Sequence, residues 1–400
     1  MIIGVVGSRF SHYSYTRNLV GAVPGVKYVP VKELCGRVEN SVRRINQFCH
    51  REIITPKNIS NQFYDLNLNK VDLIHLYQGV SYGRTPWIST FETILPRFLH
   101  LLMQDYSYKN SLSALTSKWE TQSAFEAIER PACKRIIAMS QCAADMECTL
   151  LSNLVGYKSL KEKLTVLHPP QDLLFSKFSD KPIELNGNIK FMLVGASFFR
   201  KGGREIVETF KQIREKFHFN LEIIIISSLR IDNYASGESA SDVHLMQKMM
   251  AENQDWITYY QQLPNHEVLE MMKHSHVGLL PSYADSYGYS VLEFQAAGCP
   301  VISTDIRALP ETNNDRIGWL IPVPKHSSGE AIYATEDDRL ALSSAIRNGL
   351  EQTVHQIFEN PTLVVEKGEK AFESIRENHS PQKFAERLQE IYLEALGKTV

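Results

Sequence analysis

The sequence has few cysteines and none of the spacings that bind zinc or form redox pairs. Its six cysteines lie in apolar or helical-looking stretches, and no two of them form a C-x-x-C pair. We therefore expect reduced thiols that pack inside the protein. The chain also has no run of the roughly 20 apolar residues that a membrane-spanning helix needs. The first residues, MIIGVVGSRF, lack the basic segment and long apolar core of a signal peptide. These absences predict a cytoplasmic protein.

Three well-known ligand-binding patterns are missing as well. The chain has no G-x-x-x-x-G-K-[ST] loop, which excludes the usual phosphate loop of nucleotide hydrolases. It has no G-x-G-x-x-G after a predicted strand, which disfavours a nicotinamide dinucleotide enzyme. It has no D-x-D metal signature, and a formal net charge of −2 gives no reason to expect a nucleic-acid partner.

What the sequence does contain is a regular alternation of strands and helices. Its length of 400 residues suggests two domains. Short β-branched runs each precede a helical pattern, which predicts parallel sheets covered by helices on both faces. We predict an α/β protein with two Rossmann-like, doubly wound domains. The predicted strands span residues 2–6, 72–77, 135–140, 164–168, 189–197, 221–228, 277–282 and 300–304.

The alternation stops between residues 168 and 188, where three prolines and no sustained period indicate a linker. We therefore place an N-terminal domain at 1–172 and a C-terminal domain at 186–379. The final segment, 380–400, contains an amphipathic helix with Pro381 at its first position. A second clear helix begins after Thr335, with Asp338 placed to complete a capping box.

Charge is distributed unevenly along the chain. Lysine and arginine outnumber aspartate and glutamate in the first 170 residues, whereas the rest of the chain is net acidic. A basic first half is suited to an anionic acceptor or an acidic membrane surface. An ordinary spread of surface lysines explains the same count.

One candidate site lies in the stretch PSYADSYGYSVLEFQAAGCPVI, residues 281–302. A strand ends there, and a helix begins whose first free amides, on Tyr289, Ser290 and Val291, would form an anion site. Gly288 would allow close approach of a phosphate. Asp285 and Glu293 would hold hydroxyl groups on either side. The alternative is that Asp285 caps a turn and Glu293 is a solvated helix residue.

A second candidate site follows the strand that ends at Gly195. Its loop carries Arg200, Lys201, Gly202 and Gly203 ahead of an amphipathic helix. Ligands of doubly wound folds bind at the carboxyl ends of strands. Cations beside glycine-permitted backbone neutralise a diphosphate.

These motifs resemble the retaining glycosyltransferases of family four, also called glycosyl transferases group 1, which have the GT-B fold. The resemblance spans most of the chain. It implies two Rossmann-like domains facing across a cleft, with the C-terminal helix crossing back to the N-terminal domain. The matching segments are Pro281-Ser282, Asp285 to Glu293 with Tyr287 and Gly288, Ala296 to Ile302, Val194-Gly195 to Lys201-Gly202, RIIAMSQCAADM and TVLHPPQDLLF.

The resemblance also implies an activity. Lys201, with Arg200 and Gly202, would bind the diphosphate of a UDP or GDP sugar, Glu293 would bind the ribose, and Asp285 would bind sugar hydroxyls. Transfer would proceed with retention, and the departing phosphate would assist deprotonation of the acceptor, so that no metal or cofactor is needed. The acceptor would be a glycan, a polysaccharide or a lipid-linked molecule, with possible association at the inner membrane face.

The chain departs from the family pattern at three positions. Asp285 stands where glutamate is usual, Ala196 stands where arginine is usual, and Glu92 in WISTFETILPRF stands at the position of a histidine near the reacting carbon. We treat Glu92 as a catalytic candidate together with Lys201 and Asp285. The alternative for Glu92 is a buried or capping residue. Gly7, after the first strand, is a further donor-binding candidate.

These departures keep a second class of function open. A non-catalytic sugar-nucleotide binder, or an inactive partner subunit of a glycosyltransferase, would retain the same motifs. An epimerase or phosphorylase of the same fold would need extra catalytic acids or a cofactor lysine, for which the sequence has no specific signal.

Overall fold

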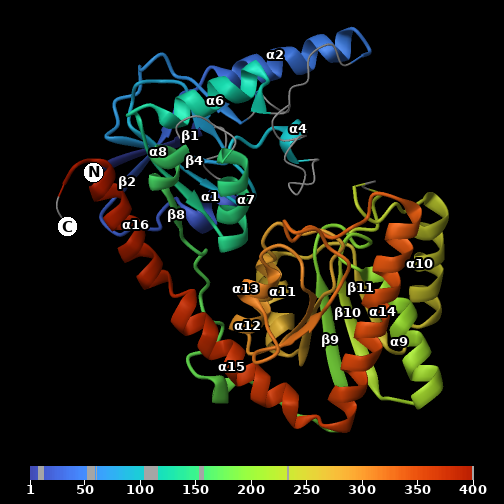
Figure 1. Ribbon diagram of the computed structural model, residues 1–400. Helices are drawn as coiled ribbons and strands as arrows, with labels where there is room; N and C mark the ends of the chain where they lie inside the picture. The colour runs from blue at the N-terminus through green and yellow to red at the C-terminus, as the bar shows by residue number, and fades with distance from the viewer. Residues whose placement is uncertain are drawn as a thin grey trace. The chain divides into compact units, whose positions relative to one another are not determined.

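A computed structural model describes residues 1–7, 13–51, 59, 61–102, 116–152, 157–231 and 234–398. The chain folds as two compact units (Figure 1). The first comprises Met1–Pro170 together with Pro381–Val400, and the second comprises Gln171–Ser380. Most of the predicted linker therefore belongs to the second unit.

The first unit is built on a parallel six-stranded sheet with the order β2-β1-β4-β6-β7-β8. Its two central strands, β4 and β6, are buried along their whole length, because helices cover both faces of the sheet. A separate parallel pair is formed by β3 and β5. The strands are β1 (Ile2–Val6), β2 (Lys27–Val31), β3 (Gln62–Phe63), β4 (Leu73–Tyr77), β5 (Val80–Ser81), β6 (Trp87–Phe91), β7 (Cys133–Ala138) and β8 (Leu164–Val166). The described helices before the linker are α1 (Tyr13–Asn18), α2 (Cys35–Phe48), α4 (Leu99–Leu102), α6 (Trp119–Glu129), α7 (Gln141–Leu151) and α8 (Tyr157–Glu162).

The last helix, α16 (Pro381–Ala395), packs on this first sheet. Leu388 and Ile391 join the apolar cluster of inward-facing strand residues. At the centre, Tyr392 Oη lies 2.8 Å from His75 Nδ1, and His75 Nε2 lies 2.8 Å from Thr90 Oγ1. Burial lowers the pKa of His75 to about 3, so the ring is neutral and serves the core. The predicted closing helix is therefore confirmed.

The second unit has the strand order β11-β10-β9-β12-β13-β14, again all parallel. The order reverses between β9 and β12, and ligands of doubly wound sheets bind at the carboxyl ends of the strands at such a reversal. The doubly wound prediction is confirmed in both units. The strands are β9 (Ile189–Val194), β10 (Leu221–Ile226), β11 (Ile257–Tyr260), β12 (Val277–Leu280), β13 (Val301–Thr304) and β14 (Trp319–Ile321). The helices are η2 (Phe178–Asp180), α9 (Gly203–Phe217), α10 (Ala240–Glu252), α11 (Asn265–Lys273), α12 (Tyr289–Ala296), α13 (Leu309–Thr312), α14 (Glu336–Glu359) and α15 (Thr362–Asn378).

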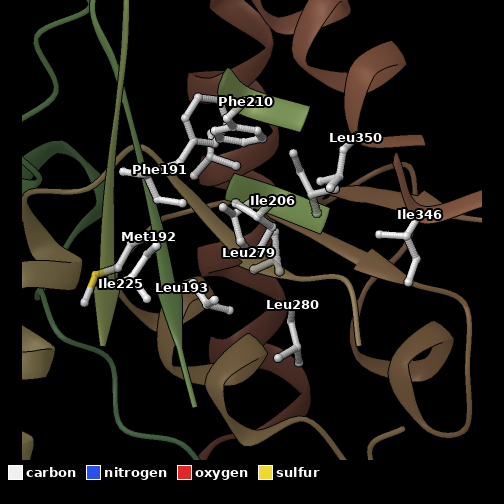
Figure 2. Packing of buried hydrophobic residues seen from close by; sticks show 14 of the residues in the cluster. Phe191, Met192, Leu193, Ile206, Phe210, Ile225, Leu279, Leu280, Ile346 and Leu350 are labelled. Atoms are coloured by element: carbon white, nitrogen blue, oxygen red, sulfur yellow. The ribbon is translucent and has the colours of Figure 1, made fainter. Parts of the chain in front are cut away.

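The core of the second unit lies between this sheet and its helices. Figure 2 shows Phe191 of β9 beside Phe210 of α9, and their ring centroids are 4.9 Å apart. Ile346 and Leu350 come from α14, where a spacing of four residues places them on one face. Thr335 and Asp338 form the predicted capping box at the start of that helix. This core holds β9 and β12 rigidly, and both strands lead into the candidate site.

The buried side chain of Lys181 holds the segment predicted as a linker against two helices of the second unit. Lys181 is 6% exposed, and its Nζ lies 3.2, 2.9 and 2.8 Å from the carbonyl oxygens of Lys273, Ser275 and Ala297. The Lys273 carbonyl ends α11, the Ser275 carbonyl follows that helix, and the Ala297 carbonyl follows α12, so all three lie where a helix dipole is negative. Nζ also lies 3.3 Å from Cys299 Sγ. One cation therefore satisfies the carboxyl ends of two helices.

Five cysteines have described side chains, and all five are free thiols. Cys133 and Cys299 are buried, as expected for packing residues. Cys49 is exposed, so the packing expectation is wrong for this residue.

Candidate functional site

The two predicted ligand loops are adjacent because they follow the neighbouring strands β9 and β12. The amide of Tyr283 donates to the carbonyl of Arg200 at 2.9 Å. In return, Arg200 Nη1 donates to the carbonyl of Ala284 at 3.1 Å. Backbone and side chain thus link the two loops in both directions.

Gly202 makes this close approach possible. Its φ is +75°, and a Cβ at this position would lie 2.2 Å from the carbonyl oxygen of Pro281. Backbone cannot move aside as a flexible side chain can, so only glycine fits here. Gly203 is similarly constrained, since its Cβ would lie 2.4 Å from the ring of Phe198. Gly202 therefore sets the distance between the two loops, and Gly203 allows the β9 loop to pack on its own Phe198.

Lys201 lies in the middle of this arrangement. Its aliphatic stem covers Gly195, where an added Cβ would lie 3.1 Å from Lys201 Cγ. Its ammonium forms an ion pair with Asp285, and the two side chains are only 13% and 10% exposed. Two of the predicted catalytic residues, from loops 84 positions apart, are thus brought together.

Asp285 also organises the start of α12. Its Oδ1 accepts a hydrogen bond from the Gly288 amide at 3.1 Å. Gly288 has a φ of +82°, and an added Cβ would lie 2.4 Å from Leu309. Asp285 therefore caps this turn, as the alternative interpretation expected, while it also pairs with the lysine. The amide of Val291 donates to the Gly288 carbonyl at 2.9 Å, so it is used within the turn.

Glu293 lies inside α12, a helix whose residues 291–296 are all buried. Its exposed fraction is 9%, so the alternative of a solvated helix residue is wrong. Tyr287 is completely buried and its ring lies 5.4 Å from that of Tyr289, which gives it a packing role. Ser290 is partly exposed at the start of the same helix.

The guanidinium of Arg200 is held close to the loop backbone. Besides the Ala284 carbonyl, it donates to Ser197 Oγ at 3.2 Å, and it lies 6.0 Å from the ring centroid of Tyr234. Such a distance permits a cation–π interaction. Arg200 therefore supplies a fixed positive charge in the same loop as Ala196, which stands where the family usually has an arginine.

Sequence reasoning missed a buried network beneath these loops. Glu205 is 1% exposed and accepts hydrogen bonds from Tyr283 at 2.9 Å and from Ser343 at 2.8 Å. Burial raises the pKa of Tyr283, which stays protonated and donates. The network fixes the β12 loop just before Asp285. Nothing in the local pattern distinguishes Glu205 from a surface acid of an amphipathic helix.

Glu92, the third catalytic candidate, lies in the first unit directly after β6. The hydroxyl of Tyr77, which ends the neighbouring β4, donates to Glu92 Oε1. Met139, next to the end of β7, lies 3.4 Å from the same hydroxyl. Glu92 is thus placed where ligands of such sheets bind. Gly7 ends the described part of its loop, and residues 8–12 lie outside the described residues.

A protonated glutamate supports the segment after Glu92. Glu147 is completely buried in α7, and its Oε2 accepts a hydrogen bond from the Leu95 amide at 2.8 Å. Desolvation raises the pKa of Glu147 from 4.5 to about 8. The carboxyl group is therefore mostly neutral at pH 7.

This raised pKa predicts a pH dependence of stability. The folded chain keeps the Glu147 proton up to about pH 8, whereas the unfolded chain loses it near 4.5. Between these values the free energy of unfolding should fall as pH rises, by up to ~1.4 kcal/mol per pH unit. Glu147→Gln carries no such proton, so its urea unfolding should depend less on pH between 5 and 8. Equal slopes for the two proteins would contradict this role.

The described ranges contain neither a candidate metal cluster nor a helix that could span a membrane. No cluster of three or more histidine, cysteine, aspartate or glutamate side chains is placed to hold a metal ion there. Among the helices in those ranges, none is both long enough and apolar enough to cross a bilayer.

Two Rossmann-like units, with adjacent loops at the strand reversal of the second, are the architecture of the GT-B fold. Residues 176–352 match the family described as glycosyl transferases group 1, so the second unit carries a glycosyltransferase domain of this group. The match covers the second unit's sheet, including both ligand loops. The resemblance seen in the motifs is thus confirmed.

Individual relatives are distant. An uncharacterized 41.2 kDa protein in the cps region of Klebsiella pneumoniae is 25% identical over 269 residues, which are 64% of this chain and 66% of that protein. A glycosyltransferase structure from Rickettsia africae is 14% identical, with a TM-score of 0.58 over 100% of this chain and 99% of that chain. The structure of HepE from Anabaena in complex with UDP is 12% identical, with a TM-score of 0.57 over 97% and 98%. The two structures establish the fold.

Proposed function

We propose that the protein transfers a sugar from a nucleotide-diphosphate sugar to an acceptor hydroxyl, with retention at the anomeric carbon. The observation that carries the proposal is Lys201. It lies on a glycine-shaped loop beside the start of α12, at the carboxyl ends of β9 and β12. Arg200 adds a second fixed cation. Both cations and the first amides of α12 suit a diphosphate.

The reaction requires little beyond charge stabilisation. The bond between the anomeric carbon and the diphosphate oxygen breaks, and a new bond forms between that carbon and the acceptor oxygen. The acceptor proton passes to the departing diphosphate, so atoms and charge balance. Lys201 stabilises the negative charge that develops on the leaving group. Glu293, buried and near the helix start, is assigned to the ribose hydroxyls. No metal or cofactor takes part in this scheme.

A uridine nucleotide is the first donor to test. HepE, which shares the fold, was solved in complexes with UDP and with UDP-glucose. A guanosine nucleotide is the second choice. The acceptor is assigned only by class, as a glycan or a lipid-linked molecule.

The test is a panel of UDP and GDP sugars, offered with simple glycan and glycolipid acceptors. Release of the nucleoside diphosphate together with a glycosylated product would support the proposal. Thermal stabilisation by nucleotide sugars without any release would instead support a non-catalytic binder. Neither stabilisation nor release would contradict both functions.

Helix α2 supports a peripheral membrane contact for the first unit. Val38, Ile45 and Phe48 are 50%, 49% and 87% exposed, and their spacing of seven and three residues places them on one helix face. Arg44 and Arg51 are also exposed on or next to this helix. An apolar face with flanking arginines suits an anionic lipid surface.

Vesicle sedimentation tests this contact. The protein should sediment with phosphatidylglycerol vesicles and much less with phosphatidylcholine vesicles. Phe48→Ser should reduce sedimentation, whereas Leu340→Ser, at an exposed leucine on α14 of the second unit, should leave it unchanged. The α2 assignment would be contradicted if Phe48→Ser sedimented with phosphatidylglycerol vesicles as strongly as Leu340→Ser and the unaltered protein.

A further inference from the structure

Asp285 uses both of its carboxylate oxygens inside the protein. Oδ2 pairs with the ammonium of Lys201, and Oδ1 accepts the Gly288 amide at 3.1 Å. The side chain is only 10% exposed. A carboxylate engaged in this way is oriented by the protein on both sides.

The two contacts connect the parts of the proposed diphosphate site. Lys201 belongs to the β9 loop, and Gly288 is the residue before α12. The short aspartate side chain keeps the ammonium close to the start of that helix. A glutamate, one methylene longer, would move the carboxylate relative to the backbone that holds it.

We propose that Asp285 is a positioning residue, which holds the ammonium of Lys201 beside the first turn of α12, and not a ligand of the donor sugar. This inference rests on the proposed function. It replaces the sugar-hydroxyl role that the family resemblance implies for this position. The diphosphate must then share Lys201 with Asp285.

Two opposite effects follow from removing the Asp285 charge. The carboxylate repels an incoming diphosphate and occupies the ammonium, so its loss should strengthen diphosphate binding. The same loss releases the Lys201 side chain from its fixed position, so transfer should become slower. If Asp285 instead bound the donor sugar, its removal would weaken only the binding of the sugar-bearing nucleotide and not that of UDP.

Calorimetric titration of Asp285→Asn separates these two models. The ligands are UDP and the UDP sugar that the protein uses as donor, or the corresponding GDP nucleotides if the donor panel selects GDP. Asparagine keeps an Oδ1 that can accept from Gly288. We expect both ligands to bind more tightly by a similar factor, about threefold to tenfold, with a lower kcat. Unchanged UDP affinity with weaker UDP-sugar binding would overturn the inference and restore the sugar contact.

Two further variants make the test specific. In a Lys201→Met background, Asp285→Asn should no longer lower kcat, because the positioning effect acts through the lysine. Asp255→Asn, which removes an exposed partner of Arg214, is the matched control and should bind UDP like the unaltered protein. An equal loss of kcat on Asp285→Asn in the Lys201→Met background would contradict the inference.

A measurement without nucleotide separates this inference from the proposed function. Lys201 should be acetylated faster by acetic anhydride in Asp285→Asn than in the unaltered protein, since its ammonium loses its partner. Equal acetylation rates of Lys201 in the two proteins would show that Asp285 does not hold the ammonium, which would contradict the inference. If the unaltered protein bound neither UDP nor GDP, the proposed function would fail even if the acetylation result held.

Discussion

Lys201→Met should slow sugar transfer by about a hundredfold to a thousandfold, the range found when one preorganised donor to a developing negative charge is removed. Methionine retains a stem that covers Gly195, so the loop keeps its packing. The loss should appear mainly in kcat if the lysine stabilises the departing diphosphate. Steady-state kinetics with the donor selected by the nucleotide-sugar panel measures it.

The control for this variant is Lys211→Met. Lys211 also pairs with a carboxylate, that of Glu215, but on the outer part of α9. Its loss should leave kcat within about twofold and the thermal stability nearly unchanged. Turnover by Lys201→Met at the unaltered rate, with the fold intact, would remove the diphosphate assignment.

Lys181→Met should destabilise the second unit by about 3–5 kcal/mol, because one partly buried and two buried carbonyl groups at the ends of α11 and α12 lose a charged donor. Methionine fills most of the same volume but cannot donate. The change should therefore reflect lost hydrogen bonds more than lost packing.

Native-state hydrogen exchange followed by mass spectrometry resolves the units separately. Peptides from the second-unit sheet should show the lower opening free energy, while peptides from the first-unit sheet should not change. Lys248→Met removes a lysine that is 64% exposed on α10 and serves as the control. A loss below about 1 kcal/mol in the second unit, within the common range of surface substitutions, would contradict this role of Lys181.

Most buried strands could be predicted from the sequence, whereas the buried strand β6 and several edge strands were not. The central strands β4, β9, β10 and β12 read as continuous apolar runs because helices cover both of their faces. By contrast, β2 and β11 lie at sheet edges and are partly exposed, so their runs are interrupted by polar residues. Pro30 within β2 further masks the pattern, although an edge strand tolerates proline. The three-residue strand β14 is too short to show a period.

The site was predictable as far as local chemistry determines it. Glycines next to cations after a strand indicated the loop of Lys201, and the helix start at Gly288 was visible in the same way. The pairing of Lys201 with Asp285 was not visible, because it depends on the side-by-side placement of β9 and β12. The same holds for Glu205 under Tyr283 and for Tyr77 beside Glu92, which are contacts between elements distant in the sequence.

Hydrogen exchange with and without UDP or GDP most directly tests the central claim that the second unit binds a diphosphate between the β9 and β12 loops. Protection should appear in peptides that cover residues 195–203 and 285–293, and Lys201→Met should largely abolish it. Protection confined to peptides outside these two segments, or unchanged protection in Lys201→Met, would contradict the account.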